Sequence, residues 1–229
     1  ARQRHGAEAV WPYHFAGTMG LVMRDGIERL RNVFGFSRQN STICTTLSVT
    51  GWKAGIGKRR GTDSREIAHT DLVVIWGTNP VATQVQVMTH MSRARKERGA
   101  KVYVIDPHRN GSAQAADVHL KLRPGTDGAL ACAVMHVMFR DGYADRDYMA
   151  RHADVPAELE AHLQSRGPEW AAGITGLSVE EIEDFARAYG QAERSFIRVG
   201  YGFSRSRNGS VNLHAVSCLP TVRGMWDKF

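Results

Sequence analysis

Three short polar segments of this 229-residue chain combine glycines and side chains suited to holding a phosphorylated ligand. A glycine-rich turn between a strand and a helix lets backbone amides reach a phosphate, and Gly77, Thr78 and Asn79 are placed for that. Turns favour these residue types for backbone reasons as well, so a purely structural role stays open. The three segments, each after an apolar run, are WGTNP, IDPHRNG and RPGTDG.

Two acidic residues in these segments could recognise other parts of a nucleotide. Asp106 closes an apolar run, where a carboxylate can accept hydrogen bonds from a ribose or a base. Asp127 comes just before a long apolar helical pattern, and as a lone residue it is expected to cap that helix. The segments therefore indicate binding of a nucleotide, with helix capping as the alternative role for Asp127.

The three cysteines differ in their surroundings. Cys132 and Cys218 lie in apolar helical patterns, where a thiol usually fills the core. Cys44 lies in STICTTLSVTG, among hydroxyl residues and before a glycine-rich segment, so we expect it in a loop. The cysteines are too few and too widely spaced for a disulfide framework, and they form no CxxC pair that could hold an iron–sulfur cluster.

The elements that position these residues form a βαβ unit. Residues 71–76 and 101–106 are typical of short buried strands, and residues 83–99 between them have helical periodicity. Such a crossover is right-handed and its strands are parallel. Residues 118–122 are an expected third strand. Because ligands bind at the carboxyl ends of strands in an open α/β sheet, the three polar segments should line one crevice.

The predicted fold class is α/β, with a parallel sheet covered by helices on both faces as in dinucleotide-binding domains. We expect residues 71–229 to form this cofactor-binding domain, with a helical subregion from about 143 to 193. A capping box at Ser178 and Glu181 begins one of its helices. Residues 1–70 are glycine-rich and poor in periodicity, which predicts an irregular, loop-rich segment that precedes the sheet and carries Cys44.

Composition and motifs argue against several classes. The chain has 30 basic and 23 acidic residues, but no zinc-finger spacing or RNA-binding aromatic signature accompanies this charge, which disfavours nucleic acid as a partner. No apolar run is long enough for a membrane helix. GWKAGIGK fails the Walker pattern and GIGKRRG fails GxGxxG, which argues against an ordinary ATP or NAD site. Hydrolase and HExxH motifs are also missing from the sequence.

In their order along the chain, these motifs resemble those of the molybdopterin oxidoreductases (dimethyl sulfoxide reductase family), which bind two molybdopterin guanine dinucleotides around one molybdenum or tungsten. The segment from Cys44 to Gly51, CTTLSVTG, is similar to the metal-ligand segment of that family. The segments similar to its successive cofactor-binding turns are DLVVIWGTNP, KVYVIDPHRN, AADVHLKLRPGTDGAL and FIRVGYGFSRSRNG. The resemblance covers essentially the whole chain.

The resemblance implies a role for each matching residue. Cys44 would be the catalytic residue and metal ligand, because a thiolate is a soft ligand suited to a redox centre. Gly125 and Asp127 would read guanine, since a carboxylate can accept both the ring NH and the exocyclic amine. His108 stands where the family often has Arg, and Arg109 is an alternative phosphate contact. The remaining implied cofactor-binding residues are Gly77, Thr78, Asn79, Pro80, Thr83, Ile105, Asp106, Pro124, Tyr201 and Gly202.

The resemblance further implies oxygen-atom, hydride or electron transfer to a small substrate. It covers only the central part of such an enzyme, so we expect the rest of a longer chain to complete it and these residues alone to be inactive. An iron–sulfur cluster in the missing N-terminal part and an electron-transfer subunit are expected possibilities. Thr45 stands where formate dehydrogenases of the family carry His, which argues against formate. Two alternatives stay open: an inactive electron-transfer scaffold of the same fold, and an ordinary nucleotide-binding module.

Overall fold

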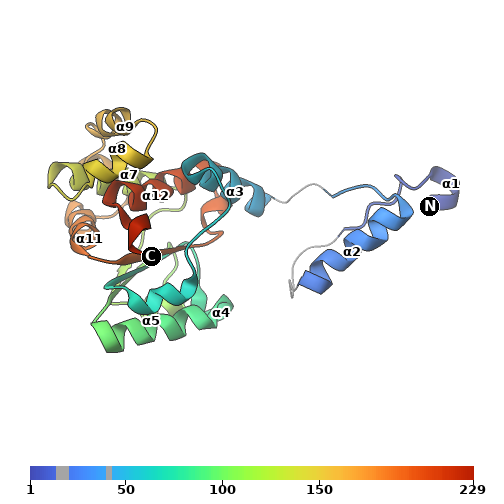
Figure 1. Cartoon of the computed structure of the whole chain (residues 1–229), viewed down its shortest axis with the longest axis horizontal. Helices are drawn as coiled ribbons and strands as arrows, with labels where there is room; N and C mark the ends of the chain where they lie inside the picture. The colour runs from blue at the N-terminus through green and yellow to red at the C-terminus, as the bar shows by residue number, and fades with distance from the viewer. Residues whose placement is uncertain (14–20, 40–42) are drawn as a thin grey trace. The chain divides into compact units, whose positions relative to one another are not determined.

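The computed structural model of the chain describes residues 1–13, 21–39 and 43–229 (Figure 1). Contacts divide the chain into two compact units, residues 1–42 and residues 43–229. The described part of the first unit contains the helices α1 (Arg2–His5) and α2 (Leu21–Phe34). Within the described residues, none of the helices combines the length and the apolar character that crossing a bilayer requires.

Four parallel strands form the sheet of the second unit, in the order β3-β2-β1-β4. They are β1 (Leu72–Trp76), β2 (Lys101–Ile105), β3 (Val118–Leu120) and β4 (Ser195–Val199). Every residue of β1 is buried, as are all residues of β2 after Lys101. Continuous burial is typical of parallel strands covered on both faces. The predicted parallel α/β sheet is confirmed.

Helices cover both faces of this sheet (Figure 1). Because successive strand side chains point to opposite faces, Trp76 packs with helices α7 (Asp127–Arg140), α11 (Val179–Gln191) and α12 (Gly209–Arg223), while Ile75 packs with α5 (Val85–Arg98). The remaining elements are α4 (Pro80–Thr83), α6 (Gly111–Gln114), α8 (Arg146–His152), α9 (Pro156–Leu163), α10 (Pro168–Thr175), and the 3-10 helices η1 (Ser64–His69), η2 (Phe203–Arg205) and η3 (Met225–Lys228).

Local signals begin and end the helices as the sequence predicts. Ser178 and Glu181 form the expected capping box at the start of α11. Gly99 adopts the left-handed conformation and ends α5 just after its basic last turn, which suits the helix dipole. Helices α8 to α11 occupy most of the region between β3 and β4, after α7.

The first 70 residues contain more helix than the sequence predicts. Besides α1 and α2, this stretch holds η1 and a third helix, α3 (Ile43–Ile56). Residues 14–20 and 40–42 of the stretch lie outside the described part. Helix α3 packs on α12 and belongs to the same compact unit as the sheet, residues 43–229 (Figure 1).

Two glycines explain why the sequence does not predict helix α3. Glycine is a poor helix former, so Gly51 and Gly55 weaken the local signal. In the structure they lie where α3 meets α12, and a Cβ on Gly51 would lie 2.2 Å from the carbonyl oxygen of Ser210. A Cβ on Gly55 would lie 2.0 Å from the hydroxyl oxygen of Ser217. Packing against another helix therefore stabilises α3 where local propensity does not.

Candidate functional site

The turns that follow the four strands gather at one edge of the sheet, because all four strands run in the same direction. They comprise residues 77–79, 106–110, 121–126 and 200–202. From β1 the chain order proceeds through β2 to β3 on one side, while β4 pairs with β1 on the other. Ligands of open α/β sheets bind where the strand order reverses in this way, so the edge near β1 and β4 is the candidate site.

The turns after β1 and β4 are in direct contact. The N–H of Gly202 donates to the carbonyl oxygen of Gly77 at 2.8 Å. The N–H of Gly200 donates to the carbonyl oxygen of Trp76 at 3.0 Å. A Cβ on Gly200 would lie 2.4 Å from the Cβ of Thr78, so only glycine allows this approach. Gly77 has a φ of 62°, which also favours glycine. Residues expected to bind the two different molybdopterin guanine dinucleotides are thus brought together.

Not every backbone amide of the β1 turn is available for a phosphate. The N–H of Gly77 donates to the carbonyl oxygen of Ile105 at 3.0 Å, so it is already used. Within the described residues, the N–H groups of Thr78 and Asn79 have no protein acceptor. These two amides are therefore the ones that can reach a ligand.

Asn79 also has a structural role, which the sequence left open. Its side-chain oxygen accepts hydrogen bonds from the hydroxyl of Ser112 at 2.7 Å and from the N–H of Ser112 at 3.3 Å. These bonds join the β1 turn to the segment after β2. Pro80 is buried at the start of α4, and the exposed Thr83 donates its hydroxyl to the carbonyl oxygen of Asn79 at 3.0 Å.

The turn after β2 presents two exposed basic side chains, His108 and Arg109, at this edge. Ile105 is fully buried and contributes only backbone there. Oδ1 of Asp106 accepts from the N–H of His108 at 2.8 Å, which holds the turn. Sequence reasoning missed Asn110, whose side chain caps α6 by accepting from the N–H groups of Ser112 and Ala113 at 3.0 and 3.1 Å.

The turn after β3 is held by two asparagines that sequence reasoning also missed. The amide groups of Asn208 and Asn212 donate to the carbonyl oxygen of Gly125 at 2.9 and 3.0 Å. Oδ1 of Asn212 accepts from the N–H of Gly128 at 3.1 Å. Gly125 has a φ of 81°, and Pro124 beside it is exposed. The only sequence signal was the amide-rich segment RNGSVN at the start of α12.

Asp127 does not cap its helix, contrary to the prediction from the sequence. Thr126 occupies the cap position without a side-chain capping bond, and Asp127 is the first helical residue. The indole N–H of Trp76 instead donates to Oδ1 of Asp127 at 2.8 Å, from the last residue of β1. Burial raises the pKa of the Asp127 carboxyl, and the Trp76 hydrogen bond opposes that rise. The carboxyl group is therefore fixed at the edge of the sheet.

Cys44 is the second residue of α3, and the expectation that it lies in a loop is wrong. Its thiol is partly buried, with Sγ 4.0 Å from Oγ1 of Thr45. Helical spacing places Cys44 on the same face as Ser48, Gly51 and Gly55. That face packs on α12 and η2.

Two buried hydroxyl groups connect this face of α3 to the β4 turn. The hydroxyl of Ser48 donates to that of Ser204 at 3.0 Å, and Ser204 donates to the carbonyl oxygen of Tyr201 at 3.0 Å. Ser210 adds a bond from its hydroxyl to the carbonyl oxygen of Leu47 at 2.8 Å. Tyr201 itself is exposed. The cysteine helix is thus attached to the turn that holds Tyr201 and Gly202.

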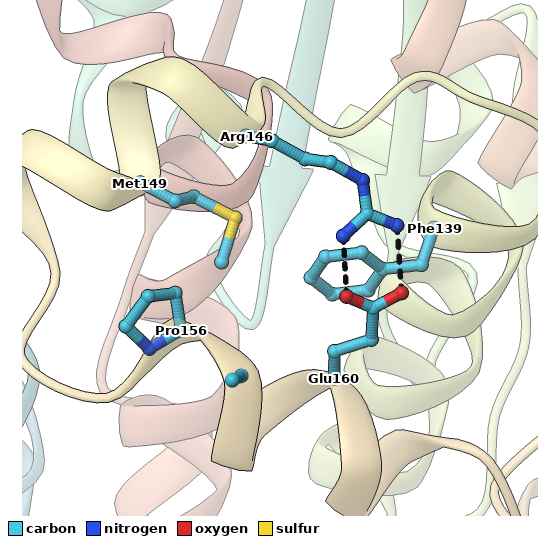
Figure 2. A pocket seen from close by; sticks show the side chains of 6 residues that line it. Phe139, Arg146, Met149, Pro156 and Glu160 are labelled. Carbon is cyan, nitrogen blue, oxygen red and sulfur yellow. Dashed lines mark hydrogen bonds and ion pairs between the residues drawn. The ribbon is translucent and has the colours of Figure 1, made fainter.

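A separate small cavity of about 190 Å³ lies in the helical subregion (Figure 2). Arg146 pairs with Glu160 and lies over the ring of Phe139, 5.3 Å from its centre. The other lining residues are Met149, Pro156 and Ala157. Its charged groups already bind each other, and none of its lining residues belongs to the turns at the sheet edge. It is not the candidate site.

No group of three side chains suited to holding a metal ion gathers in the part of the chain that the structure describes. Cys44 lies on the helix that is attached to the β4 turn through Ser48 and Ser204. A thiolate is a suitable donor for a redox-active metal.

Comparison with known proteins gives one consistent family. A family model described as molybdopterin oxidoreductase matches residues 19–228. The probable oxidoreductase YoaE of Bacillus subtilis (strain 168) is 37% identical over 222 residues, which are 96% of this chain and 32% of that protein. Formate dehydrogenase H of Escherichia coli (strain K12) is 32% identical over 182 residues, 79% of this chain and 25% of that protein.

A solved structure, acetylene hydratase from Pelobacter acetylenicus, has the same fold. Its TM-score is 0.72 at 19% sequence identity, over 87% of this chain and 27% of that one. The chain spans about a third or less of the length of these relatives.

Proposed function

The chain belongs to the molybdopterin oxidoreductase family, and from this premise we propose that it is the central part of an oxidoreductase that binds molybdenum or tungsten through two molybdopterin guanine dinucleotides. Cys44 is the protein ligand to the metal, through its thiolate. The observation that carries the proposal is the attachment of the Cys44 helix, through Ser48 and Ser204, to the turn at Tyr201. This attachment supports a metal ligand and a cofactor-binding edge in one site.

The residues at the sheet edge fit a guanine dinucleotide. Gly77, Gly200 and Gly202 bring the turns after β1 and β4 into backbone contact, which a side chain at Gly200 or Gly202 would prevent. The N–H groups of Thr78 and Asn79 are available to phosphate oxygens. Asp127 supplies a fixed carboxyl group for the two guanine donors, and its bond to Trp76 orients it.

Each residue has a distinct part in holding the cofactor. Asp127 accepts the ring NH and the exocyclic amine of guanine, while Arg109 places positive charge beside the phosphates and His108 contacts them from the same turn. Tyr201 and Gly202 border the pterin, with Ile105, Asp106, Pro80, Thr83, Pro124 and Gly125 forming the adjoining turns. The bound cofactor supplies the redox chemistry, in which oxygen atoms, hydride or electrons are exchanged with a small substrate. The protein positions the cofactor and tunes it through the Cys44 thiolate.

The substrate we propose is a small molecule other than formate. Thr45 follows Cys44 where the formate dehydrogenases of this family carry His directly after the metal ligand, so a hydroxyl group replaces an imidazole at that position. The remainder of the longer chain completes the site, and its N-terminal part and an associated subunit carry electrons to or from the metal.

The proposal is tested by analysing the cofactor of the full-length protein. Native protein, Cys44→Ala and the control Cys132→Ala are denatured, and released metal and guanine nucleotide are counted. We expect about one molybdenum or tungsten per two guanine nucleotides in native protein and in the control. Cys44→Ala should lose metal, activity or both. Native protein that contains neither metal nor guanine nucleotide, although made in a host that supplies the cofactor, would overturn the proposal in favour of an inactive scaffold.

A further inference from the structure

Arg198 is a partly buried cation at the carboxyl end of β4. It pairs in register with Ile75 of β1, on the sheet face covered by α5. Its Nε donates to the side-chain oxygen of Gln84, just before α5, at 3.0 Å. Its Nη1 donates to the carbonyl oxygen of Val199 at 2.9 Å. The guanidinium group is therefore held between the carboxyl end of β4 and Gln84, in the segment that joins β1 to α5.

Within the described residues, the charge of Arg198 is not balanced by a carboxylate. Among the described residues, no carboxylate lies within ion-pair distance of Arg198, whereas Arg95, which is also partly buried, pairs with Asp117 at 2.6 Å. Burying a cation without an anion is unfavourable. Burial lowers the pKa of Arg198, and Tyr201 is the titratable group that opposes this change. An anion at this position would remove the imbalance.

The hydrogen-bonding capacity of the guanidinium group is also incompletely used. Arginine has five N–H donors, and the bonds to Gln84 and Val199 use two of them. The other three have no acceptor in the described part of the chain. A planar fork of free N–H groups matches the oxygens of a phosphate better than a single point charge does.

We propose that Arg198 binds a diphosphate oxygen of a guanine dinucleotide at the carboxyl edge of the sheet. The inference rests on the proposed function, because it places the anion of that cofactor next to β1 and β4, where the strand order reverses. Gln84 positions the guanidinium group without neutralising it. Arg198 acts through phosphate binding and has no part in redox chemistry.

The test compares two probes on the full-length protein prepared without cofactor. GDP carries guanine and a diphosphate, whereas guanosine carries no phosphate, so their affinity ratio isolates the phosphate contact. We expect Arg198→Gln to weaken GDP binding about tenfold or more and to leave guanosine binding unchanged, because a charge-assisted bond is lost. The control Arg95→Gln removes a partly buried arginine that is already paired, and it should leave both affinities unchanged. Calorimetric titration measures all of them.

Each other outcome contradicts the inference in a recognisable way. If Arg198→Gln binds both probes as native protein does, the inference fails while the proposed function stands. If both affinities fall together, Arg198 only maintains the fold. Native protein that binds neither probe would overturn the guanine site and this inference with it. Should Arg198→Gln fail to fold, Arg198→Lys replaces it, and unchanged GDP affinity there contradicts the role of the guanidinium fork.

Discussion

The hydroxyl of Ser48 lies 3.0 Å from the hydroxyl of Ser204, and both side chains are buried. Ser48 is one helical turn after Cys44, and Ser204 follows the turn that contains Tyr201. The position of the thiol relative to the sheet edge therefore depends on this bond. The bond joins two segments that are 156 residues apart in the sequence.

Removing this bond should disturb the metal centre. We expect Ser48→Ala to lower the free energy of unfolding by about 1–2 kcal/mol, because the buried Ser204 loses a donor. In the loaded full-length enzyme, the paramagnetic resonance spectrum of the metal should also change, since Cys44 shifts. The control Ser217→Ala removes a buried hydroxyl that bonds only to a carbonyl of its own helix. Identical spectra for native protein and Ser48→Ala would contradict the positioning role.

A methyl group at Gly51 should separate α3 from α12. The added Cβ would lie 2.2 Å from the carbonyl oxygen of Ser210, and backbone cannot move aside as a flexible side chain can. We expect Gly51→Ala to cost about 1–3 kcal/mol in urea unfolding, the usual range for overpacking, and to reduce metal content. Gly173→Ala is the control, because a Cβ there meets nothing within 4 Å and alanine favours a helix. Equal stability of the two variants would refute the close contact.

The sheet and its turns could be predicted because their signals are local. The apolar runs of residues 71–76 and 101–106, separated by helical periodicity, specify parallel strands, and parallel strands bring their carboxyl ends together. The capping box at Ser178 is likewise contained in four consecutive residues. Such features depend on neighbours in sequence, so sequence patterns reveal them.

The helix that carries Cys44 and the role of Asp127 could not be predicted, because both depend on distant contacts. Gly51 and Gly55 weaken the local helix signal, and α3 is stabilised by its close packing on α12. Asp127 was expected to cap its helix, but Trp76, 51 residues away, donates to its carboxyl group. The asparagines that hold the Gly125 turn come from α12, more than 80 residues downstream. Local propensity contains no information about these partners.

Replacing Asp127 with asparagine should weaken guanine binding without destabilising the fold. Asn can still accept the Trp76 hydrogen bond with its side-chain oxygen. Its NH2 group is itself a donor, however, and cannot accept a hydrogen bond from guanine. Because burial raises the pKa of Asp127, ionising this carboxyl group costs more free energy in the fold than in the unfolded chain, so Asp127→Asn should leave the stability of cofactor-free protein at pH 7 unchanged or raise it. Guanosine affinity should fall about tenfold. Calorimetric titration that finds native affinity in Asp127→Asn would remove Asp127 from the guanine site.

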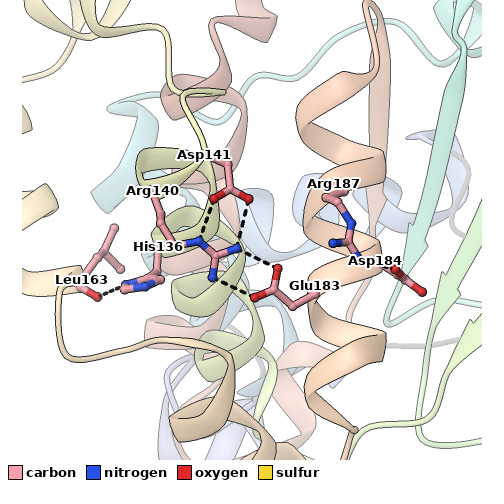
Figure 3. Close-up of polar contacts among 7 residues, drawn as sticks. All are labelled: His136, Arg140, Asp141, Leu163, Glu183, Asp184 and Arg187. Atoms are coloured by element: carbon pink, nitrogen blue, oxygen red, sulfur yellow. Dashed lines mark hydrogen bonds and ion pairs between the residues drawn. The ribbon is translucent and has the colours of Figure 1, made fainter.

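Acid should weaken the contact between α7 and α11. Arg140 donates to both Asp141 and Glu183, at 2.7 to 3.0 Å (Figure 3), and these bonds lower the pKa of both carboxyl groups. Their stabilisation is present above the unfolded-state pKa values of about 4 and is lost as the pH falls through the lower folded values.

We therefore expect Arg140→Met to cost about 0.5–1 kcal/mol at pH 7, since Arg140 is partly exposed, and much less at pH 2. Urea unfolding of the two proteins at both pH values measures this difference. A control, Arg187→Met, removes an exposed pair within α11 and should have a smaller effect. The same cost for Arg140→Met at both pH values would contradict the electrostatic explanation.

The role of Cys44 as metal ligand is tested most directly by replacing its sulfur with selenium. In the full-length enzyme, selenocysteine is introduced at Cys44 or, as control, at Cys132, and X-ray absorption is recorded at the selenium edge. Selenium at position 44 should have molybdenum or tungsten as a bonded neighbour, and selenium at position 132 should not. If the metal is present in the protein but absent from the surroundings of selenium at position 44, Cys44 is not its ligand.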